Sequence, residues 1–177
     1  MTGPADSSAA FRHFVAVRYS ALVRTAVLLT GDRGHGEDLV QSALMRTYAA
    51  WPRLADPANA EAYTRTVMVR LATRWHRRRW LGEQPSEQVP VAPADDHSAA
   101  VDLAQAVRMA LLQLPITQRA VLVLRYYEHR TEAEIADILG CSVGTVKSRA
   151  SRGLDRLRRA GLLSDVDSPR NREVRRG

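Results

Sequence analysis

The stretch from Thr131 to Arg159 constrains the fold of this chain more than any other part of the sequence. Apolar residues between Ile135 and Leu139 recur at helical spacing, and Gly140 predicts where this first short helix ends. Ser142 is a good N-cap for a second helix. That second helix carries an inward apolar stripe and an outward polar and basic stripe. The inward stripe contains Val146, Ala150, Leu154 and Leu157, and the outward stripe contains Thr145, Lys147, Ser148, Arg149, Arg152 and Arg156.

Two helices joined by a tight turn, with small polar and basic side chains near the start of the second, are typical of a DNA-reading helix-turn-helix. Arginine and lysine pair with guanine edges or phosphates, and serine and threonine suit either phosphates or bases. The alternative is an ordinary helical hairpin with a solvated basic face. We favour DNA recognition because the turn, the cap and both stripes agree with it.

The composition agrees with this interpretation. The chain has 177 residues and a net charge of +7, which favours a polyanionic partner. Cys141 is the only cysteine, so an internal disulfide is excluded and a reducing compartment is indicated. We find neither an apolar run long enough to cross a bilayer nor an export signal, so we expect a cytoplasmic protein.

A change in composition after Leu81 divides the chain. Residues 82–98 contain three prolines and four acidic residues but no Arg or Lys, which is typical of a flexible linker. About 18 such residues reach on the order of 60 Å. We therefore predict an all-α fold of two small helical domains, at residues 8–81 and 99–163, followed by a loose basic tail at 164–177.

Three helices are expected in the first domain, over about residues 8–30, from the acidic pair Glu37-Asp38 to Trp51, and over about 60–79. In the second of these helices one row of side chains is expected to face inward: Leu39, Ala43, Leu44, Tyr48 and Trp51. The glycine-rich residues 31–36 lack the Lys-Ser/Thr of a phosphate-binding loop and are interpreted as a turn. Two further helices, at 99–113 and at 116–127 with Pro115 in the first position, should precede the helix-turn-helix.

The third expected helix carries six arginines between Arg65 and Arg79 with no acidic residue among them, and Trp75 and Trp80 are interleaved with them. Basic side chains beside aromatic ones suit single-stranded nucleic acid, because its backbone attracts charge and its unstacked bases attract flat surfaces. The alternative is a core tryptophan at the solvated, arginine-rich end of a helix.

Enzyme motifs receive little support. Residues 140–144 fit the G-x-S-x-G pattern of a hydrolase, but a helix precedes them and no histidine follows Ser142. The five histidines are scattered and no cysteine cluster exists, so we expect no catalytic site, no metal and no cofactor.

Two segments carry a family resemblance. GHGEDLVQSALMRTYAAW, at residues 34–51, and LPITQRAVLVLRYYEHRTEAEIADILGCSVGTVKSRASRGLDRLR, at 114–158, are both similar to bacterial RNA polymerase sigma factors of the extracytoplasmic-function group, of the actinobacterial sigma-E-like type. The resemblance covers about residues 10–161. It implies a specificity subunit with no catalysis of its own, whose partners are core RNA polymerase and promoter DNA. Restraint by an anti-sigma factor is usual for the family.

The resemblance also implies residue roles. The −35 element would be contacted in its major groove by Thr145, Lys147, Ser148 and Arg152, with Arg149 on a phosphate. The loop 52–60 and the helix 60–79 would capture an unpaired base of the −10 element, through Asn59, Tyr63, Arg70, Arg74, Trp75 and Arg77. Core polymerase would be contacted by Asp38, Gln41 and Arg46. Arg70 stands where the family often has asparagine, so −10 specificity does not carry over at that position.

The other hypothesis is a free-standing helix-turn-helix regulator with an N-terminal effector or dimerisation domain. The DLVQ helix, the helix rich in arginine and tryptophan and the acidic linker favour the sigma factor.

Overall fold

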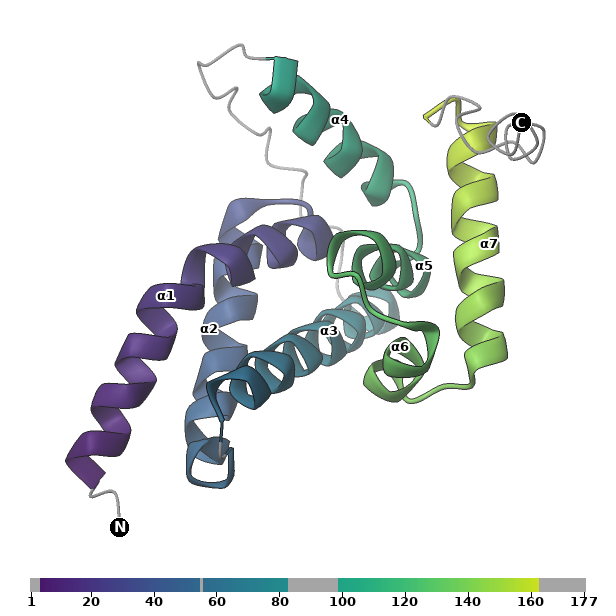
Figure 1. Ribbon diagram of the computed structural model, residues 1–177. Helices are drawn as coiled ribbons and strands as arrows, with labels where there is room; N and C mark the ends of the chain where they lie inside the picture. The colour runs from purple at the N-terminus through teal and green to yellow at the C-terminus, as the bar shows by residue number, and fades with distance from the viewer. Residues whose placement is uncertain (1–3, 55, 83–98, 163–177) are drawn as a thin grey trace, which may run out of the picture.

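A computed structural model describes residues 4–54, 56–82 and 99–162, and within these ranges all regular structure is helical. This confirms the all-α prediction (Figure 1). The elements are α1 (Pro4–Thr30), α2 (Arg33–Ala50), the 3₁₀ turn η1 (Trp51–Arg53), α3 (Pro57–Gly82), α4 (Ala99–Leu112), α5 (Ile116–Leu122), the π-helical turn η2 (Val123–Tyr127), α6 (Glu132–Leu139) and α7 (Val143–Arg159).

The N-terminal half is built from α1, α2 and α3. Its interior is mainly apolar, with fully buried side chains from each of the three helices. These include Leu22, Leu29, Leu39, Val40 and Met68. Gly36 lies where α1 and α2 approach closely, since a Cβ atom there would stand 3.2 Å from the Val27 backbone nitrogen.

The start of α2 differs from the sequence prediction. We expected a turn over residues 31–36 and a helix beginning near the acidic pair at 37–38, but α2 begins at Arg33. The reason is Asp32, which is the N-cap and accepts a hydrogen bond from the His35 backbone N–H at 2.9 Å. Gly31, with a φ of 98°, ends α1 as predicted, whereas α1 begins at Pro4 rather than near residue 8.

The start of α3 was also placed too late. The helix begins at Pro57 rather than at residue 60, so Asn59 lies on the helix and not in the preceding loop. Asp56 sets this boundary by accepting from the Ala58 N–H at 2.9 Å, and proline is tolerated in a first helical turn. The helix continues to Gly82, three residues beyond the predicted end. The remaining linker, 83–98, and the predicted tail, 164–177, lie outside the described residues.

The orientation of the Tyr48 side chain also differs from the prediction. We expected its side chain to face inward, but it is 52% exposed and lies against the Phe11 ring, with 4.9 Å between centroids. Trp51, at the end of the same row, is half-buried against Phe11 and Phe14.

The C-terminal half contains α4 to α7. A single α-helix was expected at 116–127, but α5 ends at Leu122 and the chain continues as the wider turn η2. There the Glu128 N–H donates to the Val123 carbonyl, five residues back, at 3.0 Å. Pro115 precedes the helix as its N-cap rather than occupying its first position. Of the described residues, none lies in a helix both long and apolar enough to cross a bilayer.

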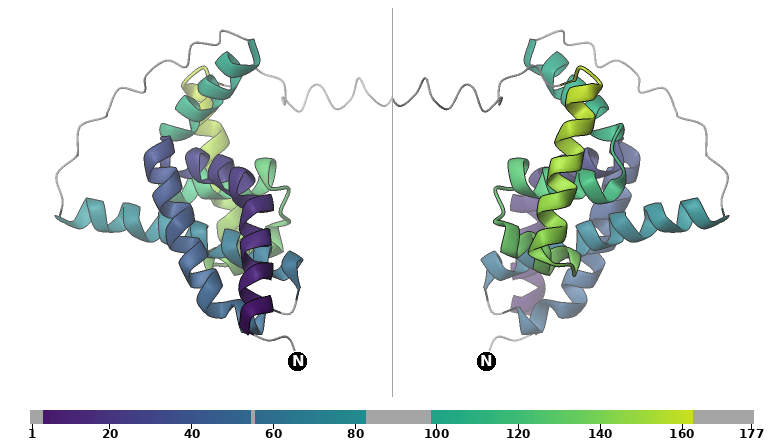
Figure 2. Two further views of the ribbon diagram at one scale, coloured as in Figure 1. Left: turned by 90° about the vertical axis from the view of Figure 1, so that its left-hand side faces the viewer. Right: turned by 90° about the vertical axis from the view of Figure 1, so that its right-hand side faces the viewer.

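The two halves pack against each other. The ribbon views place α3 beside α5 and α6, and the C-terminal end of α3 projects away from the other helices (Figures 1 and 2). Arg119 of α5 donates to the Leu29 carbonyl of α1 at 2.6 Å. The sequence predicts two domains but not this contact between them.

Candidate nucleic-acid interface

The helix-turn-helix formed by α6 and α7 is stabilised by hydrogen bonds between residues close in sequence. Thr131 and Glu134 form a capping box at the start of α6, where the Thr131 N–H donates to Glu134 at 2.8 Å. The pKa of the Glu134 carboxyl is lowered, chiefly because the carboxylate accepts this N–H. Its bonds with the Thr131 hydroxyl and with Arg130 lower the pKa further. Gly140 ends α6 with a φ of 62°, and Ser142 caps α7 by accepting from the Thr145 N–H at 3.1 Å. These elements lie where the sequence predicted them.

The outward face of α7 is less uniform than its sequence suggests. Lys147 and Arg152 are exposed, and Lys147 Nζ lies 3.6 Å from Glu132 Oε2. The other three predicted contact residues are half-buried and bonded within the domain. The Thr145 hydroxyl lies 2.9 Å from that of Ser142, the Ser148 hydroxyl donates to the Thr145 carbonyl at 3.1 Å, and Arg149 Nη1 lies 3.7 Å from Cys141 Sγ.

The inward face of α7 contains a residue that the sequence analysis missed. Val146, Ala150 and Leu157 are buried as predicted, but Leu154 is only half-buried and Gly153 is buried instead. A Cβ atom at Gly153 would lie 3.2 Å from Leu122 Cδ1, so the glycine allows α7 to approach α5 closely.

On α3, most of the predicted −10 residues share one face. Positions 59, 63, 70, 74 and 77 fall within about 60° of one another on a helix with 100° per residue. Asn59, Arg70 and Arg74 are exposed and Tyr63 is half-buried. Trp75 lies about 100° further round the helix than Arg74, and its side chain is half-buried against the apolar core. The side chain of Arg77 is outside the described part of the chain.

Arg70 contacts the other half of the molecule. Its Nε donates to the Ile138 carbonyl at 2.9 Å and its Nη2 to the Asp137 carbonyl at 3.1 Å, both in the last turn of α6. A guanidinium is favourable there because the carbonyl end of a helix is its negative end.

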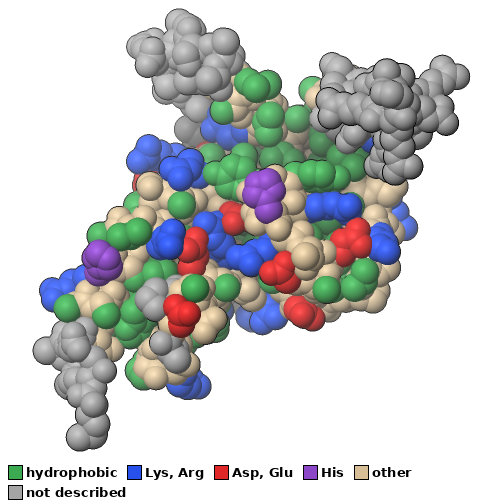
Figure 3. Space-filling model, viewed as in Figure 1, with side chains coloured by type: hydrophobic (Ala, Val, Ile, Leu, Met, Phe, Trp, Pro, Cys, Tyr) green, Lys and Arg blue, Asp and Glu red, His purple; other side chains and the backbone are tan. Residues whose placement is uncertain are grey.

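A cleft of about 1020 Å³ lies between α3, the α4–α5 turn and α7. Its basic lining residues include Arg70, Arg74, His76, Arg119 and Arg156. Figure 3 shows basic and acidic side chains side by side across the middle of one face of the molecule, rather than one uninterrupted basic patch. The net charge of +7 is therefore not concentrated on that face.

Arg119 was not identified as important from the sequence. It is 6% exposed, and burial lowers its pKa to about 10. Besides Leu29, it donates to the Leu111 and Leu114 carbonyls at 3.0 and 3.1 Å. The available signal was an arginine directly before the apolar run at residues 120–124, because such a residue needs internal acceptors if it is buried.

A further surface lies on α2. Asp38, Gln41 and Arg46 are exposed, as a contact surface requires. Met45, 74% exposed, lies seven residues after Asp38 and therefore on the same side of the helix. Met45 was not predicted as a contact residue, although an exposed apolar side chain among polar ones is a common feature of contact surfaces.

Comparisons with known proteins match both halves to one family. Residues 14–81 match Sigma-70 region 2, and residues 104–157 match Sigma-70, region 4. The chain is 42% identical over 159 residues to the RNA polymerase sigma-E factor of Streptomyces coelicolor, covering 89% of each protein. This chain is a sigma factor. It is also 32% identical over 165 residues to the ECF RNA polymerase sigma factor SigL of Mycobacterium tuberculosis, covering 89% of this chain and 93% of that protein, so it belongs to the extracytoplasmic-function group.

Solved structures agree with this assignment. The sigma factor RpoE of Bartonella quintana, in complex with the anti-sigma factor NepR, is 28% identical with a TM-score of 0.68, covering 89% of this chain and 98% of that one. CnrH in complex with the cytosolic domain of CnrY has a TM-score of 0.60, covering 91% of each chain, and at 23% identity it supports the fold alone.

The family assignment identifies the two halves of this sigma factor as region 2 and region 4. Region 2 covers most of α1 and all but the last residue of α3, and region 4 covers most of α4 to α7. The predicted resemblance is thereby confirmed, and the hypothesis of a free-standing regulator is not favoured. Sigma factors direct RNA polymerase to promoters and have no catalytic activity of their own.

Proposed function

We propose that this sigma factor binds core RNA polymerase in the cytoplasm and divides promoter recognition between its two domains. The C-terminal domain reads the −35 element as duplex DNA, and the N-terminal domain captures the −10 element as its strands part. The observation that carries this proposal is the presence, in one chain, of a region 2 domain with a basic face on α3 and a region 4 domain with basic residues exposed on α7.

For the −35 element, we assign base or phosphate contacts to the N-terminal part of α7. Lys147 and Arg152 are exposed, and both side chains can pair with guanine edges or phosphates. Lys147 would leave Glu132 to do so. Thr145 and Ser148 supply short polar groups, which favour close approach of the helix to the groove. Arg149 would leave Cys141 to reach a phosphate, and a long guanidinium side chain has the freedom to do so.

For the −10 element, we assign the face of α3 that bears Asn59, Tyr63, Arg70, Arg74 and Arg77, with Trp75 beside it. Guanidinium groups attract the phosphate backbone and aromatic rings stack on unpaired bases. Removing a base from the duplex costs a few kcal/mol, which binding to the separated strand offsets. No nucleotide hydrolysis by the sigma factor is required.

For core polymerase, we assign the exposed face of α2, with Asp38, Gln41 and Arg46 around Met45. A central apolar side chain with polar neighbours is a common arrangement in protein interfaces.

Run-off transcription tests the proposal. Purified chain and core polymerase are supplied with a library of promoter sequences, and we expect transcripts only when both proteins are present. Lys147→Ala should change which −35 sequences are used, whereas Arg158→Ala, at an exposed arginine paired with Asp155, is the matched control. Failure to bind core polymerase, together with dimeric binding to a palindromic site, would refute the proposal.

A further inference from the structure

The cleft between α3, the α4–α5 turn and α7 concentrates positive charge. Four arginines line it, and none of its described lining residues is acidic. Arg70 and Arg119 donate to backbone carbonyls, which accept hydrogen bonds but carry no net charge that would neutralise a guanidinium. The guanidinium groups of Arg74 and Arg156 have no hydrogen-bond or ion-pair partner in the part of the chain that the structure describes.

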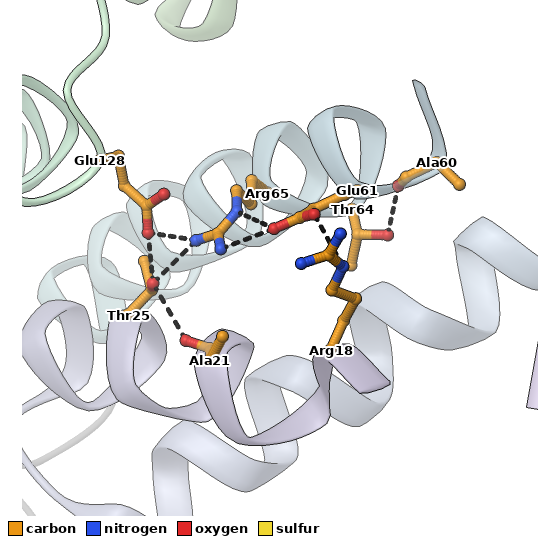
Figure 4. A network of polar contacts seen from close by, with 8 residues as sticks. All are labelled: Arg18, Ala21, Thr25, Ala60, Glu61, Thr64, Arg65 and Glu128. Atoms are coloured by element: carbon orange, nitrogen blue, oxygen red, sulfur yellow. Dashed lines mark hydrogen bonds and ion pairs between the residues drawn. The ribbon is translucent and has the colours of Figure 1, made fainter. Parts of the chain in front are cut away.

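The arginines at the nearby contact between the two halves differ from those in the cleft, because they are paired with carboxylates. Arg65 donates to Glu128 and to Glu61, and Arg18 pairs with Glu61 at 3.0 Å (Figure 4). The cleft has no such compensation, and like charges in a partly enclosed space repel one another. An anion bound in the cleft would therefore be stabilised electrostatically.

One wall of the cleft is apolar. The α4–α5 turn and the start of α5 supply it through Leu112, Leu114, Pro115 and Ile116, while Arg74 lies on α3 and Arg156 on α7. An apolar wall opposite guanidinium groups suits a small ligand that has an uncharged, flat body and more than one negative charge. A nucleoside di- or triphosphate has both parts, and arginine binds phosphate through paired N–H donors.

The size of the cleft agrees with such a ligand. Its volume of about 1020 Å³ lies at the upper end of the range for clefts that hold small molecules and cofactors. Both halves of the chain are needed to form it, because Arg74 belongs to region 2 and Arg156 to region 4.

We propose that this cleft binds a nucleoside di- or triphosphate, with Arg74 and Arg156 on the phosphates and the α4–α5 turn against the nucleoside. Arg74 also lies on the face of α3 to which we assign −10 recognition, so a bound nucleotide competes with the −10 strand for this side chain. The nucleotide thereby regulates promoter binding. This regulatory consequence rests on the proposed function, whereas nucleotide binding to the free chain does not.

Isothermal titration calorimetry of the full chain tests the site. The probes are ADP and GDP, with adenosine and inorganic pyrophosphate as partial ligands. We expect saturable one-to-one binding of at least one nucleotide and no binding of adenosine, which lacks charge. Pyrophosphate should bind at least about tenfold more weakly than the nucleotide, because it leaves the apolar wall uncovered. No binding of either nucleotide, or equal affinity for pyrophosphate, would overturn the proposal.

Two substitutions on opposite sides of the cleft locate the ligand. Arg74→Gln and Arg156→Gln, both at exposed side chains, should each weaken nucleotide affinity roughly tenfold, as expected for the loss of a charge-assisted hydrogen bond. Arg158→Gln is the matched control, because it removes the same charge from the same helix at a residue paired with Asp155. Its affinity should change less than about twofold.

Circular dichroism checks that each variant remains helical. Wild-type affinity in either cleft variant would overturn the proposal, because the ligand would then not lie between α3 and α7. An equal loss in the control would also overturn it, since it would indicate nonspecific attraction to the net positive charge.

A competition experiment tests the regulatory role. Fluorescence anisotropy follows a labelled −10 single strand, taken from a promoter that the run-off assay identifies. Saturating nucleotide should displace the strand from the wild type but much less from Arg156→Gln, which keeps Arg74 for DNA. Strand binding that is unaffected by nucleotide would overturn the regulatory role. Failure of the nucleotide-free chain to bind the strand would contradict the proposed function instead, while calorimetry would still decide whether the nucleotide site exists.

Discussion

The two helices to which we assign contacts with nucleic acid, α3 and α7, differ in how their basic side chains are held. On α7, Lys147 and Arg152 are exposed to solvent, and the caps that define the helix come from its own motif. On α3, Arg70 is bonded to the carbonyl end of α6, in the other domain. Local sequence therefore determines the helix that exposes Lys147 and Arg152, whereas packing between the two halves determines the contacts of Arg70.

The largest effect should come from breaking another contact between the two halves, the one that Arg119 makes with Leu29. Arg119→Met keeps a long side chain but leaves the carbonyls of Leu29, Leu111 and Leu114 without this donor. We expect the free energy of unfolding to fall by about 3 kcal/mol, because buried acceptors lose hydrogen bonds. Urea denaturation followed by circular dichroism measures the change.

The matched control is Arg24→Met, at an exposed arginine of α1, which should change stability by less than about 0.5 kcal/mol. Equal stability of Arg119→Met and the wild type would mean that the buried guanidinium does not hold the halves together.

The second prediction tests whether an exposed basic side chain of α7 binds DNA. Lys147→Ala should weaken binding to a −35 duplex by about 1–3 kcal/mol if the side chain reads a base. Its ion pair with Glu132 is exposed at the lysine end, so folding stability should be nearly unchanged. Fluorescence anisotropy over a set of −35 sequences measures the effect. Equal loss on every sequence would show a phosphate contact rather than base recognition.

The third prediction addresses the local stabilisation of the helix-turn-helix. Thr131→Ala removes the N-cap of α6 and should cost about 1 kcal/mol of stability, measured by thermal unfolding. Ser20→Ala, at an exposed mid-helix position in α1, is the control and should have almost no effect. A similar change in both variants would argue against a special role for the cap.

The smallest expected effect concerns pH. The pKa of Glu134 is lowered from its ordinary value of 4.5, chiefly because the carboxylate accepts the Thr131 N–H. A lowered pKa in the folded state means that the stabilisation is complete above pH 4.5 and is lost as the pH falls through the folded-state value. The difference in urea midpoint between the wild type and Glu134→Gln should therefore shrink in acid. A difference in urea midpoint that stays constant with pH would contradict a stabilising role of the ionised Glu134 carboxylate.

Prediction from sequence succeeded where the signals lay close together. Thr131, Gly140 and Ser142 define the ends of α6 and the start of α7 through bonds spanning three to five residues. Prediction failed by a few residues at the starts of two helices, where an earlier aspartate caps the first turn. Asp32 caps α2 in place of the acidic pair at 37–38, and Asp56 starts α3 ahead of the expected position.

The candidate site was predicted in part, because the face of a helix on which a residue lies also follows from short-range spacing. Helical periodicity places Arg70 and Arg74 on one face of α3 and Lys147 on the outer face of α7, so exposure could be expected. Periodicity does not indicate what a neighbouring domain covers. Tyr48 was predicted to face inward and is exposed, and Met45 was missed, because the packing of α1 on α2 decides which apolar side chains stay outside.

What the sequence alone determined is the helical class, the two domains and the DNA-reading motif, because caps, turns and amphipathic stripes act over a few residues. The tertiary structure decided the contact between the domains. Arg65 and Glu128 are 63 residues apart and Arg119 and Leu29 are 90 apart, so no local pattern relates them. Their pairing depends on burial, which lowers the local dielectric and makes a partner for each charge necessary.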